Sequence, residues 1–69
     1  MPHGTLHELM AVLDTCTETQ RRRFLLYALD GLSLAEISVL CGCSKVAVYQ
    51  SVEAVRKKFI NFFENRLNE

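Results

Sequence analysis

The feature that most constrains the fold is a short break between two helix-forming segments. The first segment, residues 34–41, follows Ser33, and Glu36 three residues later completes a capping box that satisfies amides of the first turn. Gly42 can end this helix because glycine adopts left-handed backbone angles without a Cβ clash. Ser44 can then cap a second helix. A start, a stop and a restart within so few residues indicate a helix-turn-helix.

Two further capping boxes upstream predict two more helices. Thr5 with Glu8 opens a helix over about residues 6–14, in which apolar residues recur at the spacing of one helix face. We expect this face to be buried, and it consists of Leu6, Leu9, Met10 and Leu13.

The next helix, over about residues 18–30, opens at a capping box formed by Thr17 and Gln20. Its residues 24–29 are so apolar that we expect this helix to be the central and most buried element of the fold. Gly31 would close it at the C′ position, where a left-handed residue is favoured. In the helix that follows, the residues expected to face inward are Leu34, Ile37, Leu40 and Cys41.

The last helix, over about residues 45–66, carries two apolar edges. At about 100° per residue, one narrow arc faces the core and consists of Val48, Val52, Val55, Phe59 and Phe62. The side opposite this arc carries Val46, Gln50, Glu53 and Lys57. A second apolar edge lies beside the arc and consists of Ile60, Phe63 and Leu67. This edge either packs against the first helix, which we favour because a small domain needs its apolar contacts, or forms a dimer or partner surface.

Length and composition fit this organisation. A chain of 69 residues holds a single small domain, and we expect one helix-turn-helix domain over residues 1–69. The predicted fold class is all-α, with four helices, a helix-turn-helix and no winged-helix extension. No apolar run has the length of a membrane span, and residues 1–5 lack the features of a secretory signal. We therefore expect a cytoplasmic location and no membrane partner.

Three cysteines, an odd number, do not suggest a disulfide framework and are expected to be reduced. The C-x-C pair at residues 41–43, one distant cysteine and the histidines His3 and His7 match no zinc spacing well, so we expect no metal and no cofactor. We interpret Cys41 and Cys43 as small apolar residues that face inward at the turn. The chain also lacks paired carboxylates, a Cys–His dyad and a phosphate-binding glycine loop, which argues against an enzyme.

The formal net charge is zero, which gives no overall attraction to polyanions and counts against nucleic acid. The positive charges are nevertheless grouped. One basic cluster is Arg21–Arg23, and a second, on the last helix, consists of Lys45, Arg56, Lys57 and Lys58. Such clusters are either part of a binding surface or solvated helix faces.

In a helix-turn-helix, the N-terminal residues of the second helix meet base edges in the major groove. The exposed first turns of this helix are expected to carry Lys45, Val46, Tyr49 and Gln50, with Glu53 one turn further on. Gln50 can pair with adenine, Lys45 can donate to guanine or phosphate, and Val46 can pack on a thymine methyl group. Glu53 can accept from cytosine, while Tyr49 can pack sideways or reach a phosphate.

Phosphate contacts are expected from helix N-termini, where free amides and the helix dipole favour anions, and from basic side chains. The candidates are Ser33, Ser44, Arg21, Arg22, Lys57 and Lys58. These contacts would fix the register on the duplex and carry no sequence information.

A wider pattern runs from Thr17 to Phe59. Its features are a T-E-x-Q opening at 17–20, a G-L-S-x-x-E-I stretch at 31–37, a turn glycine at Gly42, a cap at Ser44, and a last helix with Val48, Val55, Lys57 and Lys58. Together they resemble region four of bacterial sigma factors. The resemblance implies an all-α helix-turn-helix that reads the promoter −35 element and docks on the flap of the RNA polymerase β subunit.

Transferred by position, the resemblance implies DNA contact from Ser44, Lys45, Val46, Tyr49 and Gln50. It also implies that Arg21 or Arg22 and Ser33 lie near the DNA backbone. Family members often carry Arg, Thr or Glu where this chain has Val46 and Ala47, so the reading surface here is less basic and more apolar.

The sequence thus predicts a sequence-specific DNA-binding domain of a sigma-factor-like transcription initiation protein, with double-stranded DNA and the polymerase β flap as partners. A working sigma factor also needs a region that binds the polymerase clamp and melts the −10 element. We therefore expect either a domain cut from such a protein or a small sigma-like regulator. The alternative is a protein-interaction or dimerisation module with little DNA affinity, which would be a monomer or a weak homodimer.

Overall fold

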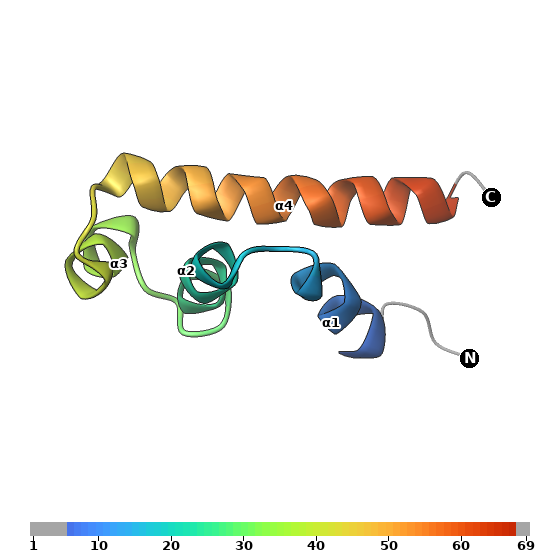
Figure 1. Cartoon of the computed structure of the whole chain (residues 1–69), viewed down its shortest axis with the longest axis horizontal. Coiled ribbons are helices and arrows are strands. Elements are labelled where there is room, and N and C mark those ends of the chain that lie inside the picture. Colours follow the sequence, from blue (N-terminus) through green and yellow to red (C-terminus); the bar gives the residue numbers. More distant parts are fainter. Residues whose placement is uncertain (1–5, 68–69) are drawn as a thin grey trace.

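The computed structural model describes residues 6–67, with side chains described as far as residue 65, and within this range every regular element is an α-helix. The helices are α1 (Leu6–Asp14), α2 (Glu18–Ala28), α3 (Leu34–Cys41) and α4 (Lys45–Leu67) (Figure 1). The predicted all-α class is confirmed. Across the same residues, no helix combines the length and the apolar character that a membrane crossing needs.

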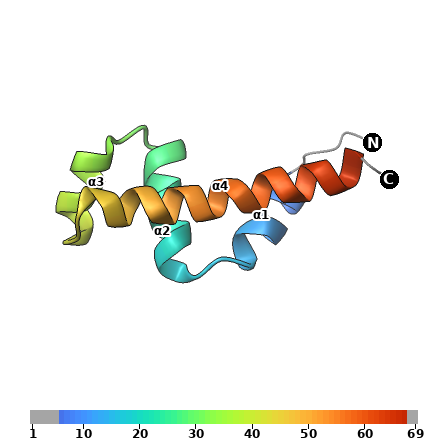
Figure 2. The same cartoon turned by 90° about the horizontal axis from the view of Figure 1, so that it is seen from above.

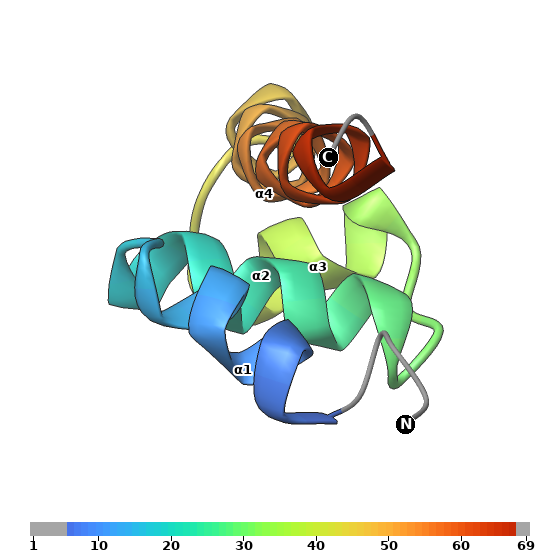
Figure 3. The same cartoon turned by 90° about the vertical axis from the view of Figure 1, so that its right-hand side faces the viewer.

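Helix α4 forms one layer of the molecule, and the three shorter helices form the other. Figure 1 shows α3, α2 and α1 in a row along one side of α4, with α3 at its N-terminal end and α1 beside its C-terminal half. Seen from above, α2 crosses α4 steeply (Figure 2). The view along α4 shows that, within residues 6–67, no other helix covers its far side (Figure 3). The first turns of α4 are therefore packed on one side only.

The start of α2 is fixed by the predicted capping box. The Thr17 hydroxyl accepts from the Gln20 amide at 3.1 Å, and the Gln20 side chain accepts from the Thr17 amide at 3.2 Å. The end of the helix was predicted less well, because α2 stops at Ala28 and its C-cap is Leu29. Gly31 does adopt a positive φ of 68°, but it lies beyond the C′ position. The box expected at Thr5 lies outside the described residues.

The predicted turn of the helix-turn-helix is confirmed in its hydrogen bonds. The Ser33 hydroxyl accepts from the Glu36 amide, and the Glu36 carboxylate accepts from the Ser33 amide at 2.9 Å. This amide, together with the Ser33 side chain, lowers the pKa of Glu36 below its ordinary value. Gly42 ends α3 with a φ of 65°, and the Ser44 hydroxyl accepts from the Ala47 amide at the start of α4.

Two groups of buried side chains hold the layers together. Leu13, Cys16 and Val55 form one group between α1 and α4. Ile37, Val48 and Val52 form the other between α3 and α4. The Phe24 side chain of α2 packs against both groups, and its ring stacks on Phe59 with centroids 5.6 Å apart.

The expectation that α2 is the most buried helix is wrong. No residue of α2 is buried, whereas Val48, Val52 and Val55 of α4 are. The reason is geometric. The α4 helix faces all three short helices, while α2 crosses it and turns its outer surface, including Tyr27, to solvent (Figure 2).

The buried faces of two short helices are also narrower than predicted. In α1, Leu13 is buried as expected, but Val12 is the second buried residue, and Leu6 and Met10 are exposed. The face of α1 that meets α4 is rotated towards Val12, since Leu13 and Cys16 pack on Val55, and Val12 lines a hollow with Lys58 and Phe62 of α4.

In α3 the inward stripe consists of Leu34, Ile37 and Cys41. Leu40 was predicted to face inward, yet 59% of its surface is exposed. At about 100° per residue, Leu40 lies on the opposite flank of Ile37 from Leu34 and Cys41. Cys41 and Cys43 pack against the buried group around Ile37, in agreement with their interpretation as small apolar residues.

Candidate nucleic-acid interface

The first turns of α4 present one face to solvent and bury the other. Val48 and Val52 lie against Ile37 of α3 and are buried. The outward residues of these turns are Lys45, Val46, Tyr49 and Gln50, all of them exposed. Val46, which is 64% exposed, lies nearly opposite the buried valines on the helix. This is the geometry in which a recognition helix can enter a major groove.

The N-terminus of α4 suits an anion better than the N-terminus of α3. At α3 both the hydroxyl and the amide of Ser33 are bonded to Glu36, so a carboxylate already lies there. The first turn of α4 carries no acidic residue, and Lys45 is exposed beside it. Since free amides and the helix dipole attract phosphate, the stronger of the two predicted capping sites is the one at Ser44.

The three consecutive arginines of α2 have different environments. An Arg21 Nη1 group donates to the carbonyl oxygen of Leu13 at 3.2 Å, which ties α2 to the end of α1. Arg23 Nη1 donates to the Ser51 hydroxyl at 3.0 Å, which ties α2 to α4. Both side chains are half-buried, whereas Arg22 is exposed. Of the predicted phosphate contacts in this cluster, Arg22 is therefore the most accessible.

Sequence reasoning did not find the structural role of Ser51. This residue is buried in α4, where its hydroxyl donates to the Ala47 carbonyl oxygen at 3.1 Å and accepts from Arg23. A serine beside the predicted core arc was the available signal. A buried hydroxyl needs a partner, and a neighbouring helix with three arginines could supply it.

Glu53 lies on the outward side of α4, as predicted, but its carboxylate is engaged. Both of its oxygens accept from the Arg56 guanidinium, each at 2.8 Å. The hydrogen bond from Arg56 lowers the pKa of Glu53, and the same bond raises the pKa of Arg56. An acceptor role for Glu53 towards cytosine would require this pair to open.

The two lysines at the middle of α4 also differ. Lys58 donates to the carbonyl oxygen of Thr15 at 2.7 Å and so holds the end of α1. Lys57 is exposed on the outward side. Lys57 is thus the better placed of the two for a phosphate.

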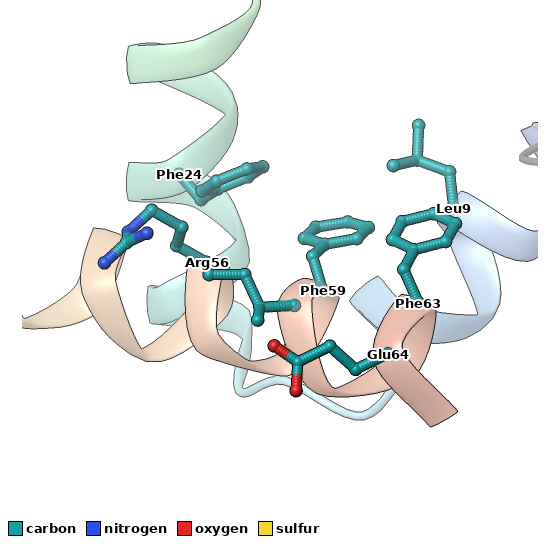
Figure 4. A pocket seen from close by; sticks show the side chains of 7 residues that line it. Leu9, Phe24, Arg56, Phe59, Phe63 and Glu64 are labelled. Carbon is teal, nitrogen blue, oxygen red and sulfur yellow. The ribbon is translucent and has the colours of Figure 1, made fainter. Parts of the chain in front are cut away.

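The predicted partner edge borders an apolar hollow between α1 and α4, which we call the α1–α4 hollow (Figure 4). It has a volume of about 490 Å³ and is lined by Leu9, Phe24, Arg56, Phe59, Ile60, Phe63 and Glu64. Ile60 and Phe63 remain 39% and 38% exposed. Leu9 therefore reaches this edge without covering it. The side chain of Leu67 lies outside the described residues.

Among the described residues, no three or more His, Cys, Asp or Glu side chains gather where they could hold a metal ion.

One comparison with known proteins gives a match. A family model described as Sigma-70, region 4 matches residues 6–59. This span covers α1, α2, α3 and α4 as far as Phe59, and it includes the exposed first turns of α4. No curated protein and no solved structure matches the chain.

Proposed function

The chain belongs to the Sigma-70 region 4 family, and on that premise we propose that it binds promoter −35-type double-stranded DNA through the first turns of α4. In sigma factors such domains are non-catalytic DNA-binding modules. The observation that carries the proposal is the one-sided burial of α4, which leaves Lys45, Val46 and Gln50 exposed. The DNA would lie against the side of α4 that no other helix covers (Figure 3).

Within this proposal, the base contacts come from two polar side chains and one apolar side chain. Gln50 pairs with adenine through its amide, Lys45 donates to guanine or phosphate, and Val46 packs on a methyl group. Tyr49 lies at the flank of the same face and reaches the sugar-phosphate backbone. Glu53 contributes only when its bond to Arg56 opens.

The phosphate contacts come from groups around this face. The N-terminus of α4 at Ser44, the Arg22 guanidinium and the Lys57 ammonium are accessible. Arg21 and Ser33 contribute less, because the first is bonded to Leu13 and the second to Glu36. With a net charge of zero, affinity depends on these few local charges rather than on the field of the whole domain.

A salt titration tests the proposal. Binding of the chain to a fluorescently labelled duplex, followed by anisotropy, is expected to weaken as salt rises, with a slope of about −0.9 in log affinity per phosphate neutralised. Three accessible groups predict a slope of roughly −3. A duplex selected from a random library serves as the specific target, and an unselected duplex is the control. Absence of binding at low salt, or an affinity that ignores salt, contradicts the proposal.

The α1–α4 hollow supports a second function, docking on RNA polymerase. An exposed apolar edge favours protein binding as the alternative to DNA binding. The apolar surface between Ile60 and Phe63 is available to a protein partner. Region 4 domains generally bind both DNA and RNA polymerase. Ile60 and Phe63 lie beyond the matched span, so the evidence for docking is the hollow itself.

Amide shift mapping separates the two functions. A fragment of the polymerase β flap is expected to shift the amides of Leu9, Phe59 and Phe63 and to leave the first turns of α4 unchanged. A duplex is expected to do the reverse. A flap fragment that shifts Lys45 and Gln50 instead, or shifts nothing, argues against docking in the hollow.

A further inference from the structure

We propose that the outward face of α4 selects thymine through its 5-methyl group, and that Val46 is the residue that contacts this group. The inference rests on the proposed function, since it names what the same face reads. It concerns a chemical group that thymine displays in the major groove and that cytosine, adenine and guanine lack.

The position of Val46 is the first argument. Its side chain stands nearly opposite the buried Val48 and Val55, at the crest of the outward face, and is 64% exposed. When the first turns of α4 lie in a groove, the residue at the crest is the one closest to the base edges. Its two methyl groups can neither donate nor accept a hydrogen bond. The favourable partner for them is another apolar group.

The engagement of nearby polar groups is the second argument. The Ser44 hydroxyl is bonded to the Ala47 amide, and both carboxylate oxygens of Glu53 are bonded to Arg56. Glu53 lies on nearly the same line of the helix as Val46, two turns further on. The carboxylate on this line of the helix, which could accept from a cytosine, is therefore already paired with Arg56.

The cost of a wrong base is the third argument. Cytosine presents its N4 amino group in the major groove. Facing Val46, that donor would lose water without gaining an acceptor from the valine, which is unfavourable for a polar group. Deoxyuridine lacks the methyl group but adds no donor. The affinity at the position facing Val46 should therefore decrease in the order thymine, uracil, cytosine.

The experiment uses the full chain and a duplex selected from a random library. Each thymidine of this duplex is replaced in turn by deoxyuridine, and affinities are measured for the native chain and for Val46→Ala. One replacement is expected to lower the affinity of the native chain for the duplex about threefold to fivefold, which is the effect of one buried methyl group. The same replacement is expected to leave the affinity of Val46→Ala unchanged. Because Val46 is exposed, this variant should keep its fold, which circular dichroism verifies.

A matched control is Val39→Ala. Val39 is also an exposed valine, 81% accessible, but it lies on α3. For this variant, the deoxyuridine replacement is expected to lower the affinity by the same factor as for the native chain. A second arm places cytosine and then 5-methylcytosine at the sensitive position, and the methylated base is expected to bind more tightly by a similar factor.

The outcomes separate this inference from the proposed function. Salt-dependent binding that is indifferent to every deoxyuridine replacement overturns thymine selection by the methyl group and leaves DNA binding intact. A loss that persists in Val46→Ala overturns the assignment to Val46. Failure to bind any duplex overturns the proposed function, and the inference falls with it.

Discussion

Replacing Ile37 with alanine is expected to destabilise the domain by about 2–5 kcal/mol, the usual cost of truncating a fully buried aliphatic side chain. Ile37 has no exposed surface and packs with Val48 and Val52 where α3 meets α4. Small domains have total stabilities at the lower end of about 5–15 kcal/mol. The loss is thus a large share of the total free energy of unfolding. Urea unfolding followed by circular dichroism measures it.

Leu40→Ala is the matched control for this substitution. Leu40 belongs to the same helix and has the same number of carbon atoms, but it is mostly exposed. Its truncation is expected to change stability by less than about 0.5 kcal/mol. Equal losses in the two variants would mean that α3 is rotated about its axis relative to the arrangement described above.

Gln50→Ala is expected to weaken binding to the selected duplex by about 1–3 kcal/mol, or roughly 5- to 150-fold. The reason is that the Gln50 amide can make two hydrogen bonds to adenine, and alanine can make neither. Binding to an unselected duplex should change little. Competition titrations of both duplexes against the same labelled probe give the ratio of the affinities for the selected and the unselected duplex directly.

Arg22→Ala provides the contrast. Arg22 is exposed on α2, and its proposed contact is a phosphate. Its loss is expected to weaken both duplexes by nearly the same factor and to reduce the salt slope by about one. If Gln50→Ala also weakens both duplexes equally, Gln50 does not read a base.

The helix starts and the turn could be predicted from sequence because they depend on residues close together in the chain. The box of Thr17 with Gln20, the box of Ser33 with Glu36 and the left-handed Gly42 involve three or fewer intervening residues. Local hydrogen bonds of this kind form whenever the backbone enters or leaves a helix.

Burial was less predictable because it depends on how helices lie relative to one another. An apolar residue such as Met10 or Leu40 fits an amphipathic pattern, but α1 and α3 each touch α4 along a narrow stripe. Val12 was missed for the same reason, since it lies just outside the predicted face and inside the observed one.

In the candidate site, too, local features could be predicted from sequence and contacts between helices could not. The period of a helix was sufficient to predict that Lys45, Val46, Tyr49 and Gln50 share one face. Sequence gave no means of assigning the individual arginines of α2, because the bonds of Arg21 and Arg23 reach Leu13 and Ser51 across the fold. The Glu53–Arg56 pair was within reach of a spacing argument, as the two residues are three apart on one helix.

The position of Phe24 has a consequence for how the molecule loses its structure. Its ring lines the α1–α4 hollow and also packs on the group around Ile37, so the end that bears α1 and the end that bears the recognition turns share one side chain. Neither end can melt while the other keeps all of its apolar contacts. Heat should therefore abolish both surfaces in a single cooperative transition, rather than freeing a partner-binding half from a DNA-binding half.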